Sequence, residues 1–200
     1  MTPVPDFAPA RVTLTGHVVQ LEPLLLEHVP ALADAGSDPR IWEWTLPDGH
    51  LPGVMAQYVR TALKDQAEGT AVPFAVRHLA SDRIIGSTRY ANIALPDRGL
   101  EVGWTWYSPQ HWRSAVNTEC KLLLLSHAFD TLGAFRVELK TDTLNTRSRA
   151  AILRLGAVEE GILRSKKVVR NGRRRDTVYY SILDHEWPAV KSRLTSRLSR

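Results

Sequence analysis

Little in this sequence supports a disulfide, a membrane span or a secretion signal. The 200 residues contain one cysteine, Cys120, which excludes an internal disulfide and a site of several metal-binding cysteines, so we expect no metal site. No apolar run approaches the length of a membrane-spanning helix. Residues 1–10 lack a basic head followed by an apolar stretch, so no signal peptide is expected. These absences predict a cytoplasmic protein without a membrane partner.

The composition is that of an ordinary globular protein. Hydrophobic residues make up 44% and charged residues 24% of the chain, which excludes disorder as a description of the whole. A chain of this length suits one domain with a sizeable core. Because the first residues are rich in proline and alanine, we expect a flexible N-terminal arm over residues 1–11 and a single domain over residues 12–200.

The charge is moderately positive and unevenly spread. The chain has 26 basic and 21 acidic residues, a net charge of +5, which fits a polyanionic partner such as a phosphate-bearing cofactor, a nucleic acid or a ribosome-bound substrate. Residues 161–175, GILRSKKVVRNGRRR, contain seven basic residues and no acidic one. This run fits a solvated hairpin or a partner-binding surface. No aromatic RNA-binding signature accompanies it, which disfavours direct nucleic-acid binding.

The order of patterned segments predicts the fold class. Strands alternate with amphipathic helices, and Asn171-Gly172 is a strong hairpin signal near the end of the chain. We expect an α+β protein with a mixed, mostly antiparallel sheet and helices on both faces. The predicted segments are a strand ending at Pro23, helices ending at Gly36 and near Gly69, a helical start at 38–44, strands 72–78, 83–90 and 100–107, helix 118–133, strand 135–141, helix 146–155 between Asn145 and Gly156, strands 161–169 and 175–183, and helix 186–199.

Two regions bear most directly on function. In strand 100–107, alternation predicts Leu100, Val102, Trp104 and Trp106 on one face and Glu101, Gly103, Thr105 and Tyr107 on the other. The loop that follows opens onto a helix, whose free N–H groups and dipole suit a pyrophosphate. Small residues, Ser114 and Ala115, allow phosphates to approach the backbone, and Asn117 can cap the helix. An ordinary strand-to-helix connection would have the same pattern.

The loop carries a family resemblance. HWRSAVNTECK matches the pattern W-G/R-x-P/A/G-x-N-x-E-x-K at Trp112, Arg113, Ala115, Asn117, Glu119 and Lys121. Together with GHVVQLEPL, DTLNTRSRAAILRLGAVEEGILR and NGRRRDTVYYSILDHEWPAV, it makes residues 12–195 resemble RimJ/RimL-like N-acetyltransferases of the GNAT superfamily. The sequence departs from the general GNAT loop, Q/R-x-x-G-x-G/A, by the loss of both loop glycines, which Arg113 and Ala115 replace.

The resemblance implies a GNAT fold with splayed central strands and a transfer of the acetyl group of acetyl-CoA to an amine. The acceptor would be a protein N-terminal α-amine, as on a ribosomal protein, or a small amine, and a homodimer is common among similar proteins. The loop amides of residues 113–117, those of Arg113, Ser114, Ala115, Val116 and Asn117, would bind the pyrophosphate beside Trp112. The backbone of strand 100–107, Trp106 included, would pair with the pantetheine arm.

The resemblance also assigns catalytic residues. Glu101 resembles the glutamate found on this strand in many GNAT enzymes and is the candidate general base, although a surface glutamate paired with a basic neighbour fits too. Glu138 and Asp142 are weaker candidates. Asn145 and Ser148 would order the pantetheine and lie near the thiol, or they simply cap a helix. A tyrosine acid seven residues after Asn145 is excluded, because Ile152 stands there.

Two alternatives from other functional classes stay open. The first is a non-catalytic CoA-binding sensor, which the missing loop glycines favour. The second is a basic ribosome- or nucleic-acid-binding module that uses the run 161–175.

Overall fold

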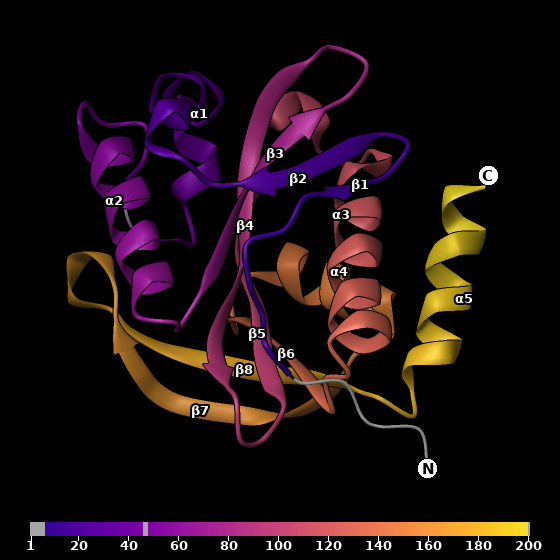
Figure 1. Ribbon diagram of the computed structural model, residues 1–200. Coiled ribbons are helices and arrows are strands. Elements are labelled where there is room, and N and C mark those ends of the chain that lie inside the picture. Colours follow the sequence, from indigo (N-terminus) through magenta and orange to yellow (C-terminus); the bar gives the residue numbers. More distant parts are fainter. Residues whose placement is uncertain (1–6, 46–47, 200) are drawn as a thin grey trace.

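A computed structural model describes residues 7–45 and 48–199. Within them, eight strands form one sheet in the order β1-β2-β3-β4-β5-β6-β8-β7 (Figure 1). The strands are β1 Leu14–Thr15, β2 Val19–Pro23, β3 Val72–His78, β4 Arg83–Ala94, β5 Gly99–Tyr107, β6 Arg136–Asp142, β7 Val158–Val168 and β8 Arg174–Leu183. The helices are α1 Val29–Ala35, α2 Val54–Ala67, α3 Ala115–Ser126, α4 Thr146–Leu155 and α5 Trp187–Leu198.

The sheet is antiparallel except where β5 meets β6. That parallel pairing covers only three residues on each strand, Gly99–Glu101 against Arg136–Glu138. Beyond Glu101 the two strands separate, so backbone groups on the β6 side of β5 lose a strand partner. The predicted α+β class, the mostly antiparallel sheet and the splay of the central strands are confirmed.

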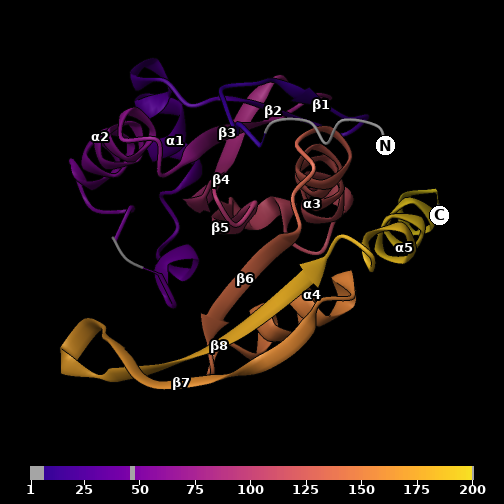
Figure 2. The same ribbon diagram turned by 60° about the horizontal axis from the view of Figure 1, so that its bottom comes forward.

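Helices cover both faces of the sheet, as predicted (Figure 2). One core joins α3, α4 and α5 to the sheet through residues such as Leu124, Ile152 and Leu194. The other core joins α1 and α2 to β3, β4 and β5 through Leu32, Val59 and Trp106. The second core covers only part of its face and leaves β6, β8 and β7 free of α1 and α2.

The predicted faces of β5 are correct only up to Gly103. Leu100 and Val102 pack in the core of α3, but Trp104 has φ of 49° and is 37% exposed. β5 has one more residue than β4 at this point, because Arg89 pairs with Gly103 while Ser87, two residues earlier, pairs with Trp106, three residues later. The bulge reverses the alternation: Trp106 packs in the core of α1 and α2, and Tyr107 joins Leu100.

Helix α3 begins earlier than the sequence suggested. Ser114, rather than Asn117, is the N-cap, and its hydroxyl accepts a hydrogen bond from the Val116 N–H. Asn117 lies in the first turn. The regular helix ends at Ser126, and a π-helical segment, His127–Thr131, continues to Gly133, whose φ of 65° turns the chain out of the helix. A π segment has no simple sequence signal, so the prediction of one helix over 118–133 missed it.

The ends of α4 were predicted correctly. Asn145 is the N-cap and accepts a hydrogen bond from the Ser148 N–H, and Gly156 closes the helix with φ of 105°. The basic run forms the end of the β7–β8 hairpin, with a short turn over Arg170–Gly172. Two register shifts interrupt the pairing of β7, between Glu159 and Gly161 and between Leu163 and Lys167.

Part of the segment predicted as an N-terminal arm, residues 1–11, lies within the described residues. Residues 1–6 lie outside the described residues, but Phe7 is 8% exposed and belongs to the core of α3, with the Arg98 guanidinium 5.8 Å from its ring centre. Burial of one aromatic ring is enough to hold this part of the segment against the domain.

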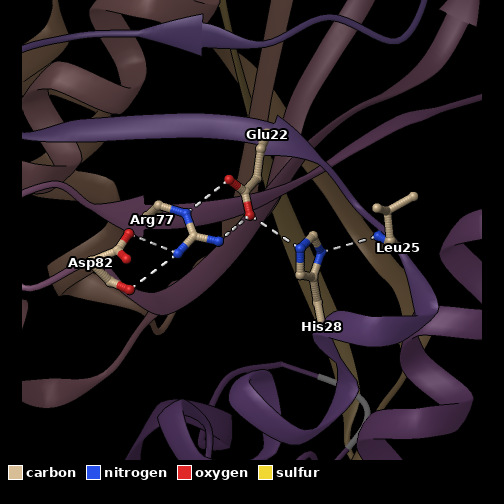
Figure 3. A network of polar contacts seen from close by, with 5 residues as sticks. All are labelled: Glu22, Leu25, His28, Arg77 and Asp82. Carbon is tan, nitrogen blue, oxygen red and sulfur yellow. Dashed lines mark hydrogen bonds and ion pairs between the residues drawn. The ribbon is translucent and has the colours of Figure 1, made fainter.

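A polar network links β2 and β3 to the turn before α1 (Figure 3). Arg77 on β3 donates to both carboxylate oxygens of Glu22 on β2 and to Asp82, and Glu22 also contacts His28 Nε2 at 3.1 Å. His28 Nδ1 accepts the Leu25 N–H, so Nε2 carries the ring proton. The network fixes the start of the helical layer relative to the sheet. Among the described residues, no helix is long and apolar enough to cross a membrane.

Candidate functional site

The splay of β5 from β6 opens into a cleft of about 1820 Å³. Its two ends differ in character. One end, here called the helix half, is lined by residues of the segments 109–121 and 145–155. The other end, here called the hairpin half, is lined by residues 41–45, Glu101, Lys140 and residues 166–179. Eight of the residues predicted to form the site line this one cleft: Glu101, Trp106, Trp112, Arg113, Ser114, Asn117, Asn145 and Ser148.

The start of α3 forms the floor of the helix half. Ser114 Oγ donates to the His111 carbonyl at 2.7 Å while it caps Val116, so its hydroxyl is engaged within the loop. Ala115 is exposed, and Val116 is buried in the core at 1% exposure, so Val116 offers only its backbone to a ligand. Helix N-termini of this kind attract anions through free N–H groups and the helix dipole.

Arg113 keeps the backbone shape of the glycine that it replaces. Its φ is 59°, in the left-handed region that glycine adopts without cost and other residues adopt at about 1 kcal/mol. Arg113 thus adopts a backbone conformation that glycine would favour, and its exposed side chain places a cation at the helix half. Ala115, the second replacement, is the first residue of the helix and needs no special φ.

Trp112 connects the two cores beside this loop. Its side chain packs against both hydrophobic clusters, and its Nε1 donates to the Tyr107 carbonyl at 2.9 Å. The guanidinium of Arg147, on α4, lies 4.3 Å from the centre of the Trp112 ring. Together with Arg113 it places a second cation at the cleft. Trp112 thus holds the end of β5 against the start of α3.

Asn145 and Ser148 face the same cleft from α4. The Asn145 Oδ1 atom is engaged as the helix cap at 3.0 Å from the Ser148 nitrogen, which leaves its amide NH₂ and the Ser148 hydroxyl toward the cleft. The capping role is shown, and any contact with a ligand would come in addition to it.

Glu101 lies where the cleft passes through the sheet. It is 3% exposed, and its Oε2 atom is 2.5 Å from Lys140 Nζ on β6 and 2.5 Å from Asn92 Nδ2 on β4. Its Oε1 atom lies beside Gly103, where a β-carbon would be 2.9 Å away. Both donors contact Oε2, and no donor among the described residues contacts Oε1.

The two weaker candidates for the base lie in other surroundings. Glu138 pairs with Arg136 and does not line the cleft. Asp142 is 1% exposed; its burial raises its pKa, but hydrogen bonds from Arg173 and from the Leu144 N–H outweigh burial and lower the pKa overall. A carboxylate held in its ionised form by an arginine is a weak base.

Trp106 is buried at 5%, between Trp42 and Tyr58, although it also lines the cleft. Its indole Nε1 donates to the Tyr58 hydroxyl at 3.4 Å. The ring therefore shapes the wall of the cleft from within the second core.

The sequence did not reveal the role of two charged residues in the loop motif. Lys121 is 6% exposed and donates to Thr105 Oγ1 at 2.8 Å, directly at the bulge of β5. Burial lowers the pKa of Lys121 to about 8. Glu119 faces away from the cleft and accepts the N–H groups of His17, Val18 and Val19 at 2.7–2.9 Å. The E-x-K spacing was visible, but its partners come from distant strands.

The basic run lines the hairpin half and is more than a solvated surface. Arg170 forms an ion pair with Asp48 and donates to the Thr45 carbonyl, which ties the hairpin tip to the segment before α2. Arg173 bonds to Asp142 at 2.5 Å and lies 5.9 Å from the centre of the Trp44 ring. Among the described residues, no cluster of three His, Cys, Asp or Glu side chains could hold a metal ion.

The comparisons with known proteins agree with this geometry. The model of the acetyltransferase (GNAT) domain matches residues 19–158. YoaA and YdaF of Bacillus subtilis, the first an uncharacterised N-acetyltransferase and the second named for a proposed ribosomal N-acetyltransferase activity, are 28% and 32% identical over 116 and 108 residues. These matches cover 58% and 54% of this chain, and they span 64% and 58% of the two relatives' length.

Solved structures extend the likeness over nearly the whole chain. A GCN5-related N-acetyltransferase from Brucella melitensis is 31% identical with a TM-score of 0.88, over 98% of this chain and 89% of that one. RimJ of Mycobacterium smegmatis, solved with CoA-disulfide, has the same fold at 21% identity and a TM-score of 0.78, over 96% of both chains. The chain belongs to the GNAT family of acetyltransferases.

Proposed function

We propose that this protein transfers the acetyl group of acetyl-CoA to a primary amine, with the α-amine of a protein N-terminus as the preferred acceptor. The observation that carries the proposal is the single cleft that runs from the start of α3, through the splay of β5 and β6, to the β7–β8 hairpin. Such a passage lets two substrates enter from opposite ends and meet at the splay.

The helix half fits acetyl-CoA, which supplies the acetyl group as an activated thioester. The N–H groups of residues 113–117 and the dipole of α3 would hold its pyrophosphate, and Arg113 and Arg147 would add positive charge. The unpaired edge of β5 beyond Glu101 would bind the pantetheine arm as a strand binds a peptide. Asn145 and Ser148 would line the path of this arm with their free polar atoms.

Glu101 would hold the proton that the acceptor ammonium must lose, because only the neutral amine attacks. Its Oε1 atom is free of the contacts that engage Oε2, and it lies at the splay. Lys121, whose pKa lies at about 8, can hold a proton at Nζ beside the β5 bulge and release it near neutral pH. These two groups on opposite sides of β5 would provide the acid–base help, which is typically worth about 10²–10⁴-fold.

A protein N-terminus suits the hairpin half because Trp44 and the β7–β8 hairpin line it, which offers a peptide both an aromatic ring and polar side chains. The name of YdaF supports a ribosomal protein as the acceptor. An amine at a chain terminus can enter such a passage end first.

The test is a turnover assay with acetyl-CoA against unblocked N-terminal peptides, polyamines and aminoglycosides, with N-terminally blocked copies of the peptides as controls. We expect acetylation of unblocked peptides, located at the α-amine by mass spectrometry. Acetyl-CoA at about 100 times its dissociation constant should stabilise the fold by about 2.7 kcal/mol. Stabilisation without turnover of any amine would indicate a CoA-binding sensor, and stabilisation by RNA alone would indicate a nucleic-acid-binding module.

A further inference from the structure

Positive charge exceeds negative charge in the hairpin half of the cleft. Six basic side chains line it: Lys140, Lys166, Lys167, Arg170, Arg173 and Arg175. Four carboxylates lie in or beside it, and three of them are already paired: Glu101 with Lys140, Asp48 with Arg170, and Asp142 with Arg173. The fourth, Glu43, is exposed at the rim. An ammonium that enters here meets an excess of two positive charges.

Among the described residues, no carboxylate forms a hydrogen bond with Arg175, which is partly buried. Its side chain is 16% exposed, and its buried Nε atom has no hydrogen-bond partner among the described residues. The closest carboxylate atom, Asp142 Oδ2, is 3.9 Å from Nε and is already bound to Arg173. Thr177 lies two residues after Arg175 on the same face of β8. Its Oγ1 atom is also buried without a hydrogen-bond partner among the described residues. Buried donors without partners destabilise a fold, so native proteins keep few of them.

The cations around Arg175 repel one another, which also favours a negative group at this place. Burial lowers the pKa of Arg175, and the positive charge of Arg173 lowers it further, against the opposing effect of Asp142. Burial also lowers the pKa of Lys167, followed by the charges of Lys140 and Arg175. A negative group placed between Arg175 and Lys167 would relieve this repulsion and fill the missing hydrogen bonds.

We propose that Arg175, Thr177 and Lys167 form a subsite for a carboxylate of the acceptor. The preferred acceptor is then a peptide N-terminus with an acidic side chain among its first few residues. This inference rests on the proposed function, in which the amine of the same peptide lies at Glu101.

The spacing favours a peptide over a free amino acid. Glu101 is bonded to Lys140, which is opposite Tyr179 on β8. Tyr179 and Arg175 are four residues apart on that strand, about 13 Å at ~3.3 Å per residue. The amine and carboxylate of a free amino acid lie far closer together than this. An extended peptide spans the distance within about four residues.

The experiment compares peptides that differ only by Asp or Asn at position 2, 3 or 4. Their affinity for the CoA-loaded protein is measured by calorimetry, and their KM by turnover. We expect at least one Asp peptide to bind about tenfold more tightly than its Asn partner, as for one charge-assisted contact of about 1.4 kcal/mol. Arg175→Gln should abolish the difference. The matched control is Arg174→Gln, since Arg174 is exposed on the other face of β8 and does not line the cleft.

Folding of Arg175→Gln should not limit the test, because loss of a crowded, partly buried cation should leave the melting temperature unchanged or higher. Equal affinity for every Asp and Asn pair, or an equal loss of preference in Arg174→Gln, would overturn the subsite. Free aspartate that binds as tightly as the peptides would overturn the peptide assignment. Tighter binding of Asp peptides without acetylation of any peptide would refute the proposed function but support the subsite. Acetylation without a preference for Asp peptides would support the proposed function but refute the subsite.

Discussion

Gly16 and Glu119 are packed so closely that a β-carbon on Gly16 would lie 2.4 Å from Cδ of Glu119. The absence of a side chain at Gly16 lets the carboxylate of α3 reach three backbone N–H groups at the start of β2. The glutamate therefore clamps the outer strands of the sheet to the helix whose N-terminus lines the cleft.

We predict that Glu119→Ala destabilises the fold by about 1–3 kcal/mol, because three backbone donors lose their acceptor and two of them are partly buried. Gly16→Ala should destabilise it too, since the carboxylate must move. Urea unfolding measures both. Glu27→Ala, at an exposed glutamate, is the control and should change stability by less than about 0.5 kcal/mol. Equal destabilisation by Glu27→Ala and Glu119→Ala would show that the hydrogen bonds of Glu119 do not stabilise the fold.

The second prediction concerns Lys121 and pH. Burial lowers the pKa of Lys121 from 10.5 to about 8. Between pH 8 and pH 10.5 the unfolded chain therefore binds more protons than the folded protein, so the contribution of Lys121 to the free energy of unfolding rises with pH in this range. Below pH 8 the buried charge should destabilise the fold by about 3 kcal/mol, from the size of the shift. Lys121→Met should be more stable than the parent at pH 7, and the difference should shrink toward pH 10.5. Denaturant unfolding of both proteins across this range measures it, and a difference independent of pH would contradict it.

The third prediction separates phosphate binding from helix capping at the start of α3. Ser114→Ala removes a cap and should lower stability by about 1 kcal/mol while acetyl-CoA affinity changes little, because the hydroxyl is engaged within the loop. Ala115→Asp should keep or raise stability, since an acid near a helix start is favourable, but should weaken acetyl-CoA binding strongly. Thermal melts and calorimetry on both variants give the two quantities. Retained affinity in Ala115→Asp would place the cosubstrate elsewhere.

The fourth prediction tests Glu101 as the base. Glu101→Gln keeps the shape of the side chain and should lower turnover by about 10²–10⁴-fold, with a smaller effect on acetyl-CoA affinity. Higher pH should restore part of the rate, because more of the acceptor is then already neutral. The matched control is Glu138→Gln, at the residue paired with Glu101 on β6 but outside the cleft. Unchanged turnover in Glu101→Gln would assign proton removal to another group or to water.

Local signals in the sequence predicted local structure well. The caps of α4, Asn145 and Gly156, were correct because a side-chain cap and a left-handed glycine are decided within one turn of the helix. The helical start predicted at 38–44 is a short 3₁₀ turn over Pro39–Trp42, which Asp38 caps by accepting the Arg40 N–H. The splay of the central strands followed from the family resemblance.

Features that depend on distant contacts were not predictable. The bulge at Trp104 places a bulky residue at positive φ, which no local propensity favours, and so the faces of β5 beyond Gly103 were assigned wrongly. The sequence did not indicate that Arg170 would pair with Asp48, because the two residues are far apart along the chain. The partners of Glu119 and Lys121 were hidden for the same reason.

The two interruptions in β7 also affect how the protein behaves at high concentration. β7 is the edge of the sheet and exposes Val158, Ile162 and Val168, the kind of strand on which other chains stack. Register shifts break its pairing twice, and Ser165 turns out of the strand with φ of 51° to bind Asp176 through its N–H. A second chain would find no straight row of free amides longer than a few residues. Deletion of Ser165, which would straighten β7, should therefore increase the formation of fibrous aggregates relative to the parent, as measured by light scattering at high concentration.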